Sequence, residues 1–329
     1  MVHVVTGPAP QIESVTPWVG PEGQRMRRLE LHLTYTCPER CLFCSEDHRM
    51  ARFHPYPVTL GRVVRILREH AARGVEAVHF TGGEPTVHPD FLTIVQTARQ
   101  LGLRTSMGTI GTGLSNPTFA ARAMPYLDDV LFSLHGADAA THDGLTRHPG
   151  SYTKLMRAVE NSRQKVGFRP SFNTVLTRVN LASLPAIGAQ VAASGGGLWI
   201  VSNLTPEGAG EDRYDELSVR LVDIGGIAEA AVAAAAPAIV RFFGVPACVL
   251  PAALRMYTND LHWNPRVTVE WASHPGKVSL DGIYSWTPER KRAQAAPCGA
   301  CTWRELCPGA FAAYLERFGS GELRPLEAS

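Results

Sequence analysis

The sequence predicts an α/β protein in which parallel strands form a partial (β/α)6 barrel, followed by a small C-terminal module. Strand-like and helix-like segments alternate six times within about 180 residues, which is typical of a parallel sheet. The alternation stops after Gly210, and residues 244–329 combine few regular signals with four of the seven cysteines. A complete eight-unit barrel takes about 250 residues, so a six-unit version fits the space available.

Each predicted strand is a short apolar or alternating run bounded by turn residues. The six barrel strands are expected at 29–34, 77–80, 104–108, 130–134, 170–176 and 198–204. Apolar residues at helical spacing predict the intervening helices at 60–73, 90–100, 151–164 and 184–193. Because the carboxyl ends of parallel barrel strands carry the chemistry, residues that directly follow these strands are the candidates for a site.

The domain organisation follows from where this pattern starts and stops. We expect an irregular lead-in over 1–27, the barrel over 28–210, a connecting segment over 211–243, and a cysteine-containing module over 244–329. Within the connecting segment, an Ala-rich helix is predicted at 216–236 and a strand at 238–243. The last module has too few regular segments for a hydrophobic core of its own, so a bound metal is expected to stabilise it.

Composition excludes several classes of protein. The chain has 329 residues, 45% of them hydrophobic and 19% charged, which excludes a disordered protein. A net charge of +2, from 32 basic and 30 acidic residues, gives no sign of a nucleic-acid or membrane-surface partner. No signal peptide is evident, and the longest apolar stretch contains Glu229 and Pro237, so a cytoplasmic protein is expected.

Three cysteines directly follow the first predicted strand, in Cys37-Pro-Glu-Arg-Cys41-Leu-Phe-Cys44. Thiolates are soft ligands that suit an iron–sulfur cluster or zinc, and His48 is a possible fourth ligand of a Cys3His zinc site. A position at the carboxyl ends of the strands favours a cluster with one iron open to a substrate or cofactor.

A Gly82-Gly83-Glu84 turn follows the second predicted strand, at the same end of the barrel. Two glycines let the backbone approach a ligand closely, and a carboxylate can accept hydrogen bonds from an ammonium group. Such a turn is common by itself. Its position one β/α unit after the three cysteines is what makes the combination specific.

This combination resembles the radical S-adenosylmethionine (SAM) superfamily over about residues 27–210. The resemblance implies that Cys37, Cys41 and Cys44 hold a [4Fe–4S] cluster whose fourth iron binds the methionine part of SAM. It also implies a set of SAM contacts, with Phe43 against the adenine and the turn around the ammonium: Phe43, Gly82, Gly83, Glu84, Ser133, Asn173 and Arg178. Residues 205–208 match the exit of the sixth strand.

Some of these contacts have plainer alternatives. Ser133, Asn173 and Arg178 are also what an ordinary strand end contains. The chain departs from many relatives at Thr109-Ile110-Gly111, where they have Thr-Asn-Gly, so Ile110 lacks the amide that such an Asn supplies.

The remaining four cysteines are Cys248, Cys298, Cys301 and Cys307. Four thiolates suffice for a second, closed [4Fe–4S] cluster. The tail resembles the C-terminal modules called SPASM and twitch, although Phe311 stands where SPASM has its next cysteine, so a shortened module with one auxiliary cluster is expected. The alternatives are a zinc knot and, for Cys248 alone, a hydrogen-atom donor of the kind that a radical epimerase requires.

The resemblance implies reductive cleavage of SAM to a 5′-deoxyadenosyl radical, which abstracts a hydrogen atom from a natural-product precursor. A peptide substrate is expected, with cross-linking, oxidation or epimerisation as the outcome. The alternatives are a small-molecule (aminocyclitol or sugar) dehydrogenase or epimerase and, more remotely, a non-catalytic zinc-binding protein, which would not explain Gly82-Gly83-Glu84. The implied partners are a flavodoxin or ferredoxin electron donor and, because few residues precede the first strand, a separate leader-binding protein.

Overall fold

The computed structural model describes residues 19, 23–53, 58–262, 265–274, 277–285 and 291–327, so most of the predicted lead-in lies outside the described residues. A single sheet of nine strands forms the centre, in the order β7-β6-β5-β4-β3-β2-β1-β8-β9. The strands are β1 (Arg28–Thr34), β2 (Ala77–Gly82), β3 (Arg104–Thr109), β4 (Asp129–Ser133), β5 (Ser171–Val175), β6 (Leu198–Ser202), β7 (Ile239–Phe243), β8 (Arg266–His274) and β9 (Lys277–Ser285).

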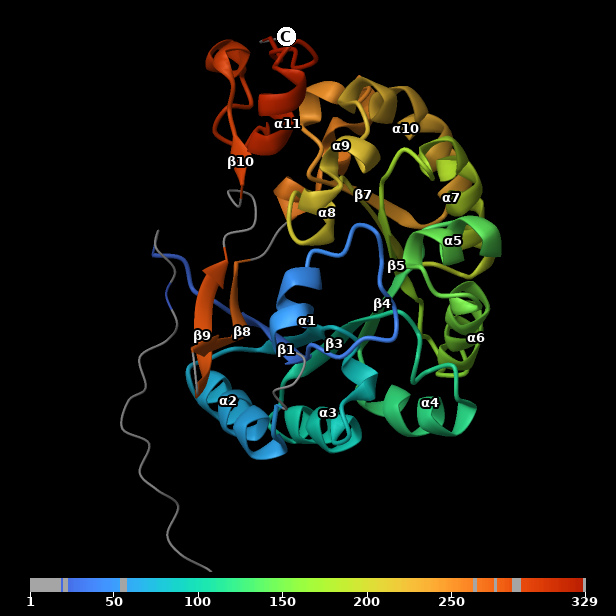
Figure 1. The fold of residues 1–329 in the computed structure, drawn as a ribbon, viewed down its shortest axis with the longest axis vertical. Helices are drawn as coiled ribbons and strands as arrows, with labels where there is room; N and C mark the ends of the chain where they lie inside the picture. The colour runs from blue at the N-terminus through green and yellow to red at the C-terminus, as the bar shows by residue number, and fades with distance from the viewer. Residues whose placement is uncertain are drawn as a thin grey trace, which may run out of the picture.

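The sheet confirms the predicted fold class. Strands β1 to β8 are all parallel to their neighbours, and only β9 runs antiparallel, against β8. The sheet curves but does not close, and helices cover its outer side (Figure 1). The fold is therefore a partial parallel barrel, as the alternation of segments predicts.

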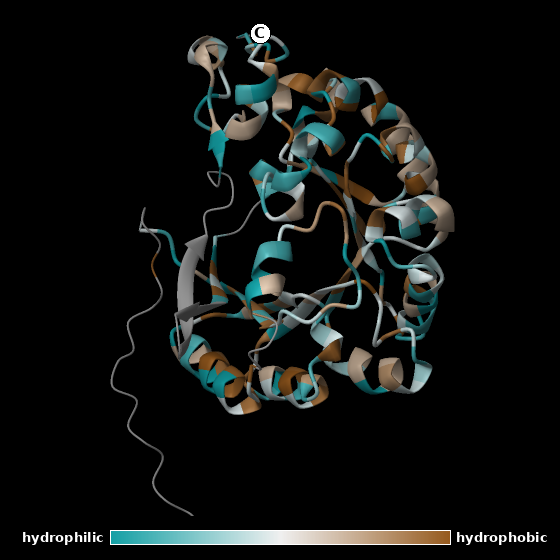
Figure 2. Ribbon diagram, in the orientation of Figure 1, coloured by the Kyte–Doolittle hydropathy of each residue, from teal (hydrophilic) through white to brown (hydrophobic). Residues whose placement is uncertain are grey.

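Helices connect the parallel strands on the outside of the curve (Figure 1). Many of them carry both brown and teal residues, as expected for one buried and one exposed side (Figure 2). The helices are α1 (Asp47–Phe53), α2 (Leu60–Ala72), α3 (Phe91–Gln100), α4 (Pro117–Ala123), α5 (Ala139–Thr146), α6 (Ser151–Ser162), α7 (Leu184–Ala193), α8 (Ala209–Asp212), α9 (Tyr214–Leu217), α10 (Leu221–Ala235) and α11 (Ala312–Phe318). Among them, none is both long and apolar enough to cross a membrane.

The sheet extends beyond residue 210 at both edges. At one edge β7 pairs in parallel with β6, and α10 packs closely against α7, where a Cβ at Gly188 would lie 2.7 Å from the carbonyl oxygen of Ala231. At the other edge, β8 pairs with β1 and carries β9 as a hairpin partner. The expectation of little regular structure after residue 244 is wrong here, because residues 266–271, Arg-Val-Thr-Val-Glu-Trp, are rich in β-branched and aromatic residues and form a strand that pairs with β1.

The predicted helix over 216–236 is also wrong in one respect. The chain forms the short α9, then an extended stretch through Ser218 and Arg220, and only then α10. A hydrogen bond connects this extended stretch to the residues that follow β5: Arg178 Nε donates to the carbonyl of Ser218 at 2.7 Å. The break falls at Ser218 and Val219, two weaker helix formers, and the hydrogen bond from Arg178 holds the chain extended there.

The C-terminal segment contains the two-stranded pair β10 (Arg292–Ala293) and β11 (Ala310–Phe311), followed by α11. It docks on the barrel through Tyr314, whose hydroxyl accepts from the backbone N–H of Leu221 at 3.0 Å and donates to Glu322 at 2.6 Å. Phe311 packs against Gly244, where a Cβ would lie 2.7 Å from its ring. The segment therefore sits over the barrel end at which β7 emerges.

Candidate active site

A cavity of about 380 Å³ opens at the carboxyl ends of the strands. Its size is that of a typical small-ligand site. Residues from β1 through β5, the loops after β1, β2, β3, β4 and β6, the strands β7 and β8 and the C-terminal segment all contribute to its wall. Among those predicted from the sequence, the lining residues are Cys37, Cys41, Phe43, Cys44, Gly82, Gly83, Ser133, Asn173 and Thr205.

The first cysteine loop runs from β1 to α1 along this cavity. Its three cysteines are free thiols of intermediate exposure. Backbone hydrogen bonds fix the loop to its neighbours: Leu42 N–H donates to Leu145 at 2.9 Å, and Ala209 N–H donates to the carbonyl of Cys44 at 2.9 Å. Gly208 is needed for this second approach, since a Cβ there would lie 2.5 Å from the Cys44 oxygen.

The chemistry of these thiols suits a cationic metal group. Burial raises the pKa of Cys37 to about 12 and that of Cys44 to about 11, and it raises the pKa of Cys41 well above its ordinary value. The bare thiols are therefore neutral near pH 7. A bound metal ion offsets the free-energy cost of burying a negatively charged thiolate, because it stabilises the thiolate directly.

The spacing of the sulfurs separates a cluster from a single zinc ion. Zinc with ligands at about 2.3 Å brings its sulfurs within about 4 Å of one another. In the part of the chain that the structure describes, the one group of three or more His, Cys, Asp or Glu ligand atoms within 4.8 Å contains no cysteine. His48 lies 2.8 Å from Asp212 and does not line the cavity. The arrangement fits a larger cluster better than a Cys3His zinc site.

The Gly82-Gly83-Glu84 turn is tied to the cysteine loop through its backbone. Gly83 N–H donates to the carbonyl of Thr34 at 2.6 Å, and Glu84 N–H donates to that of Thr36 at 2.9 Å. A Cβ at Gly82 would lie 2.3 Å from the Thr34 oxygen, and one at Gly83 would lie 2.4 Å from the Thr36 oxygen. The two glycines are therefore required for the close approach of two strand-end loops, besides any approach to a ligand.

Glu84 itself is fully buried and does not line the cavity. Its carboxylate accepts hydrogen bonds from the hydroxyls of Thr86 and Thr109 and from the backbone N–H of Ile110 at 2.9 Å. Burial raises its pKa in spite of these donors. The geometry assigns Glu84 the task of joining the loops after β2 and β3, and the contact with a ligand ammonium stays a prediction.

Phe43 lines the cavity and is buried against His135, with ring centroids 4.6 Å apart in an edge-on arrangement. Burial holds the pKa of His135 well below its ordinary value, so this imidazole is neutral. His135 Nδ1 accepts from the backbone N–H of Val175 at 3.2 Å, which fixes the ring. A flat apolar surface is thus held in place at the edge of the cavity, as a stacking surface for an aromatic ligand group requires.

The remaining predicted contacts divide into two groups. Ser133 and Asn173 are cross-strand partners on β4 and β5, and both line the cavity. Asn173 Oδ1 accepts from the hydroxyl of Ser202 at 2.7 Å. Arg178 is exposed, binds Ser218 and is absent from the cavity lining, so its contact with SAM stays a prediction without structural support.

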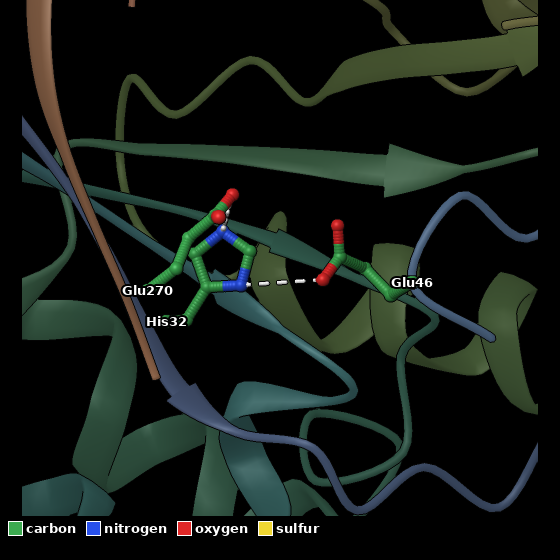
Figure 3. Close-up of side chains that lie close together, drawn as sticks. All are labelled: His32, Glu46 and Glu270. Atoms are coloured by element: carbon green, nitrogen blue, oxygen red, sulfur yellow. Dashed lines mark ion pairs between the residues drawn. The ribbon is translucent and has the colours of Figure 1, made fainter. Parts of the chain in front are cut away.

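A charged wall faces the cavity from β1, β8 and the start of α1, and sequence reasoning missed it. His32 lies between two carboxylates, with Nδ1 3.5 Å from Glu46 and Nε2 3.8 Å from Glu270 (Figure 3). Arg49 lies 3.0 Å from each of these carboxylates. The guanidinium pairs with one oxygen of each carboxylate, and the other oxygen of each faces His32, so the three residues form a polar, charged surface in the cavity wall.

The signal for this wall was present in the first strand. Glu30 and His32 occupy the alternate positions of β1, which point into a barrel interior that is usually filled by branched apolar residues. Glu30 forms a partly buried ion pair with Arg266 of β8 at 3.0 Å. A charged residue at an inward position of a barrel strand thus indicates a cavity wall.

The second cysteine group gathers in the C-terminal segment. Cys248, Cys298, Cys301 and Cys307 line one small, mainly apolar pocket, although Cys248 is about fifty residues away in sequence. The backbone N–H of Leu326 donates to the sulfur of Cys301 at 3.4 Å. Burial raises the pKa of Cys248 and of Cys307. Cys248 does not line the main cavity, whereas Phe311 does.

Part of the chain is similar in sequence to known proteins. Residues 31–186 match the family model described as Radical SAM superfamily, whose members use a [4Fe–4S] cluster and SAM. The chain is 33% identical over 157 residues to a PqqA peptide cyclase of Rhodopseudomonas palustris, covering 48% of this chain and 41% of the relative. It is 34% identical over 192 residues to the mycofactocin maturase MftC of Mycobacterium ulcerans, covering 57% and 50%.

The fold also has a counterpart among solved structures. The crystal structure of Streptococcus suis SuiB bound to precursor peptide SuiA aligns with a TM-score of 0.63 and 14% identity, covering 92% of this chain and 75% of SuiB. At this identity the similarity shows the fold alone. The chain spans about half the length of the curated relatives it matches.

Proposed function

We propose, from the radical SAM domain that residues 31–186 form, that this protein reductively cleaves SAM and uses the 5′-deoxyadenosyl radical to abstract a hydrogen atom from a peptide. The observation that carries the proposal is the meeting of Cys37, Cys41, Cys44 and the Gly82-Gly83 turn at one cavity. The names of the curated relatives, a peptide cyclase and a maturase, support a peptide substrate.

The residues around the cavity take distinct roles in this proposal. Cys37, Cys41 and Cys44 hold a [4Fe–4S] cluster, which when bound supplies the electron that cleaves the sulfonium of SAM. The backbone of Gly82 and Gly83 approaches the methionine ammonium, while buried Glu84 fixes that backbone from behind. Phe43 lies against the adenine, and Ser133 and Asn173 offer polar atoms.

The charged wall supports a polar substrate. His32 of β1, Glu270 of β8 and Glu46, which directly precedes α1, lie in the cavity wall, whereas Ser133 and Asn173 belong to β4 and β5. In the proposal, they orient a polar backbone or side chain of the peptide so that one C–H bond faces the radical carbon. Orientation of this kind is a main source of rate and selectivity in such sites.

The second cysteine group is assigned to an auxiliary cluster. The gathering of Cys248 with Cys298, Cys301 and Cys307 supports the role of ligand over that of hydrogen donor, because its sulfur belongs to the other pocket. Such a cluster can accept the electron that a substrate radical loses, which would give cross-linking or oxidation as the outcome.

Iron content and SAM cleavage test the core of this proposal. Anaerobic reconstitution should give about eight irons per chain, and dithionite with SAM should yield 5′-deoxyadenosine. The variant C37A/C41A/C44A should keep about four irons and lose cleavage. Zinc in place of iron without SAM cleavage, or cleavage by the triple variant, would contradict the assignment.

The peptide substrate is tested by co-expression with short peptides encoded beside the gene. Mass spectrometry should detect loss of two hydrogen masses for a cross-link or oxidation, or deuterium incorporation from D2O for an epimerisation. E270Q should lower peptide conversion while dithionite-driven formation of 5′-deoxyadenosine continues. Conversion of an aminocyclitol or sugar, with every peptide unchanged, would favour a small-molecule enzyme.

A further inference from the structure

A buried ion pair lies beside the second cysteine group, and the inference drawn from it rests on the auxiliary cluster of the proposed function. Arg292 of β10 lies 3.2 Å from Asp260, and the two side chains are only 1% and 3% exposed. Burying such a pair costs free energy that an apolar pair of similar volume would not cost. Its presence therefore has to be explained by the groups around it.

Arg292 holds the turn that follows Cys307. Its Nε and Nη2 both donate to the carbonyl of Gly309, at 2.8 and 2.5 Å. Gly309 has a φ of +88°, and a Cβ there would lie 2.0 Å from the carbonyl oxygen of Ala293, so only glycine fits between this turn and β10. The guanidinium is thus fixed on the turn that directly follows a proposed cluster ligand.

The same guanidinium also contacts the wall of the main cavity. Its Cζ lies 5.3 Å from the centroid of the Phe311 ring, and Phe311 lines the cavity. This ring packs edge-on against Phe243, another lining residue, with centroids 6.5 Å apart. Because Gly309 lines the cysteine pocket, Arg292 contacts one residue of each wall and connects the two sites.

The charge of Arg292 acts on the sulfur of Cys307. Burial raises the pKa of this thiol, whereas the N–H groups of Gly309 and Ala247 and the charge of Arg292 lower it. Asp260 raises this pKa, by less than Arg292 lowers it. A field that favours a thiolate also favours an added electron on a cluster held by the same sulfurs, because both changes place negative charge there.

Other charges near the two cysteine groups act differently. Arg304 and Arg324 line the second pocket, but both residues are exposed, so water and salt screen their charges. In the first cysteine loop, burial and then the carboxylates of Glu84 and Glu39 raise the pKa of Cys37. The stronger neighbouring charges are thus negative at Cys37 and positive at Cys307.

We propose that Arg292 is a positioning residue that raises the reduction potential of the auxiliary cluster, so that the cluster accepts an electron from the substrate radical. After hydrogen abstraction, the peptide radical loses one electron to the cluster and one proton to water, which completes a two-electron oxidation of the peptide. Charges and hydrogen bonds near the sulfurs are main determinants of such potentials. Asp260 holds the guanidinium in place and limits the rise.

Potentials measured without the first cluster test this role. The C37A/C41A/C44A background should keep about four irons, so a titration followed by electron paramagnetic resonance reports the auxiliary cluster alone. In this background R292M should make reduction about tenfold less favourable, which is about 59 mV for one electron. D260N keeps the guanidinium and removes the opposing charge, so it should shift the potential upward.

Shifts of opposite sign are not expected of a purely structural pair. R292K keeps the charge and loses the paired donors to Gly309, so it should recover most of the potential that R292M loses. The matched control is R317M. Arg317 also pairs with an aspartate and also lies over an aromatic ring, 5.2 Å from the Tyr214 centroid, and its loss should leave the potential unchanged.

Three results would overturn the inference: shifts of the same sign in R292M and D260N, unchanged potentials in both, or an equal shift in R317M. If R292M does not hold the cluster, D260N decides, and a potential at or below that of the background contradicts the proposal. Failure of the proposed function looks different, because the C37A/C41A/C44A background would then contain no iron before any substitution at Arg292.

Discussion

Glu84 and Thr109 are joined across two loops, with the Thr109 hydroxyl 2.8 and 3.0 Å from the two carboxylate oxygens of Glu84. The residues follow neighbouring strands and are 25 positions apart. Since Glu84 is fully buried, this bond fixes the relative position of the loops after β2 and β3, and with them one side of the cavity.

The first prediction concerns this bond. T109V keeps the volume of the side chain but removes a donor from a buried carboxylate, so the free energy of unfolding should fall by about 1–3 kcal/mol. Chemical denaturation of T109V and of the unaltered protein measures this difference in unfolding free energy. T97V, which removes a hydroxyl from the surface of α3, should change stability by about 0.5 kcal/mol or less. Equal losses of unfolding free energy in the two variants would show that the hydrogen bond to Glu84 contributes no more to stability than one on the surface.

The second prediction concerns Gly83. In G83A the new Cβ would lie 2.4 Å from the backbone oxygen of Thr36, so the turn and the cysteine loop must separate. We expect a loss of stability of about 1–3 kcal/mol, together with weaker SAM binding by calorimetry.

Gly61 provides the control, because a Cβ at this helical position meets nothing within 4 Å. G61A should be neutral or stabilising by up to about 1 kcal/mol. Unimpaired SAM binding by G83A would refute the idea that these glycines hold the two loops together.

The third prediction is a pH dependence. Burial lowers the pKa of His79 to about 3, below its ordinary value of 6.5. The unfolded chain therefore binds this proton first as the pH falls. The stability associated with a neutral His79 is complete above pH 6.5 and is lost between pH 6.5 and about pH 3, by up to about 5 kcal/mol.

Unfolding free energies of H79Q across this range provide the check. The variant should show a shallower loss of stability toward acid than the unaltered protein. A slope for H79Q as steep as that of the unaltered protein would assign the acid sensitivity to other groups.

The fourth prediction separates the two proposed clusters. C248S should lower the iron content from about eight to about four per chain and leave dithionite-driven SAM cleavage in place. C307S should have the same effect, because both sulfurs line the same pocket. If C248S kept all of its iron while C307S lost iron, Cys248 would not be a ligand of the second cluster.

Much of the candidate site was accessible from the sequence because its parts are local. Cys37, Cys41 and Cys44 lie within eight residues, and the Gly82-Gly83-Glu84 turn directly follows a strand. Since parallel strands end at a common edge, their proximity to each other could be inferred without coordinates. The gathering of Cys248 with Cys301 required only the count of cysteines and a resemblance.

Other parts could not be predicted because they depend on distant partners. The charged wall needs β8 beside β1, and Glu270 lies far from His32 in the sequence, so their pairing depends on the sheet order. The exposure of Arg178 depends on its bond to Ser218, which also interrupts a predicted helix. Arg178 matches a family pattern, yet its side chain points to a different element.

The sequence alone determined the repeating β/α units, the two groups of cysteines, and the end of the barrel at which the first group meets the Gly82-Gly83 turn. These are consequences of hydrophobic periodicity and short spacing, which act within a few residues. The tertiary structure alone decided that Glu84 turns inward and that His32 faces Glu46 and Glu270. These pairings arise because folding buries groups from remote segments together, and burial then decides which of them are charged and which are accessible.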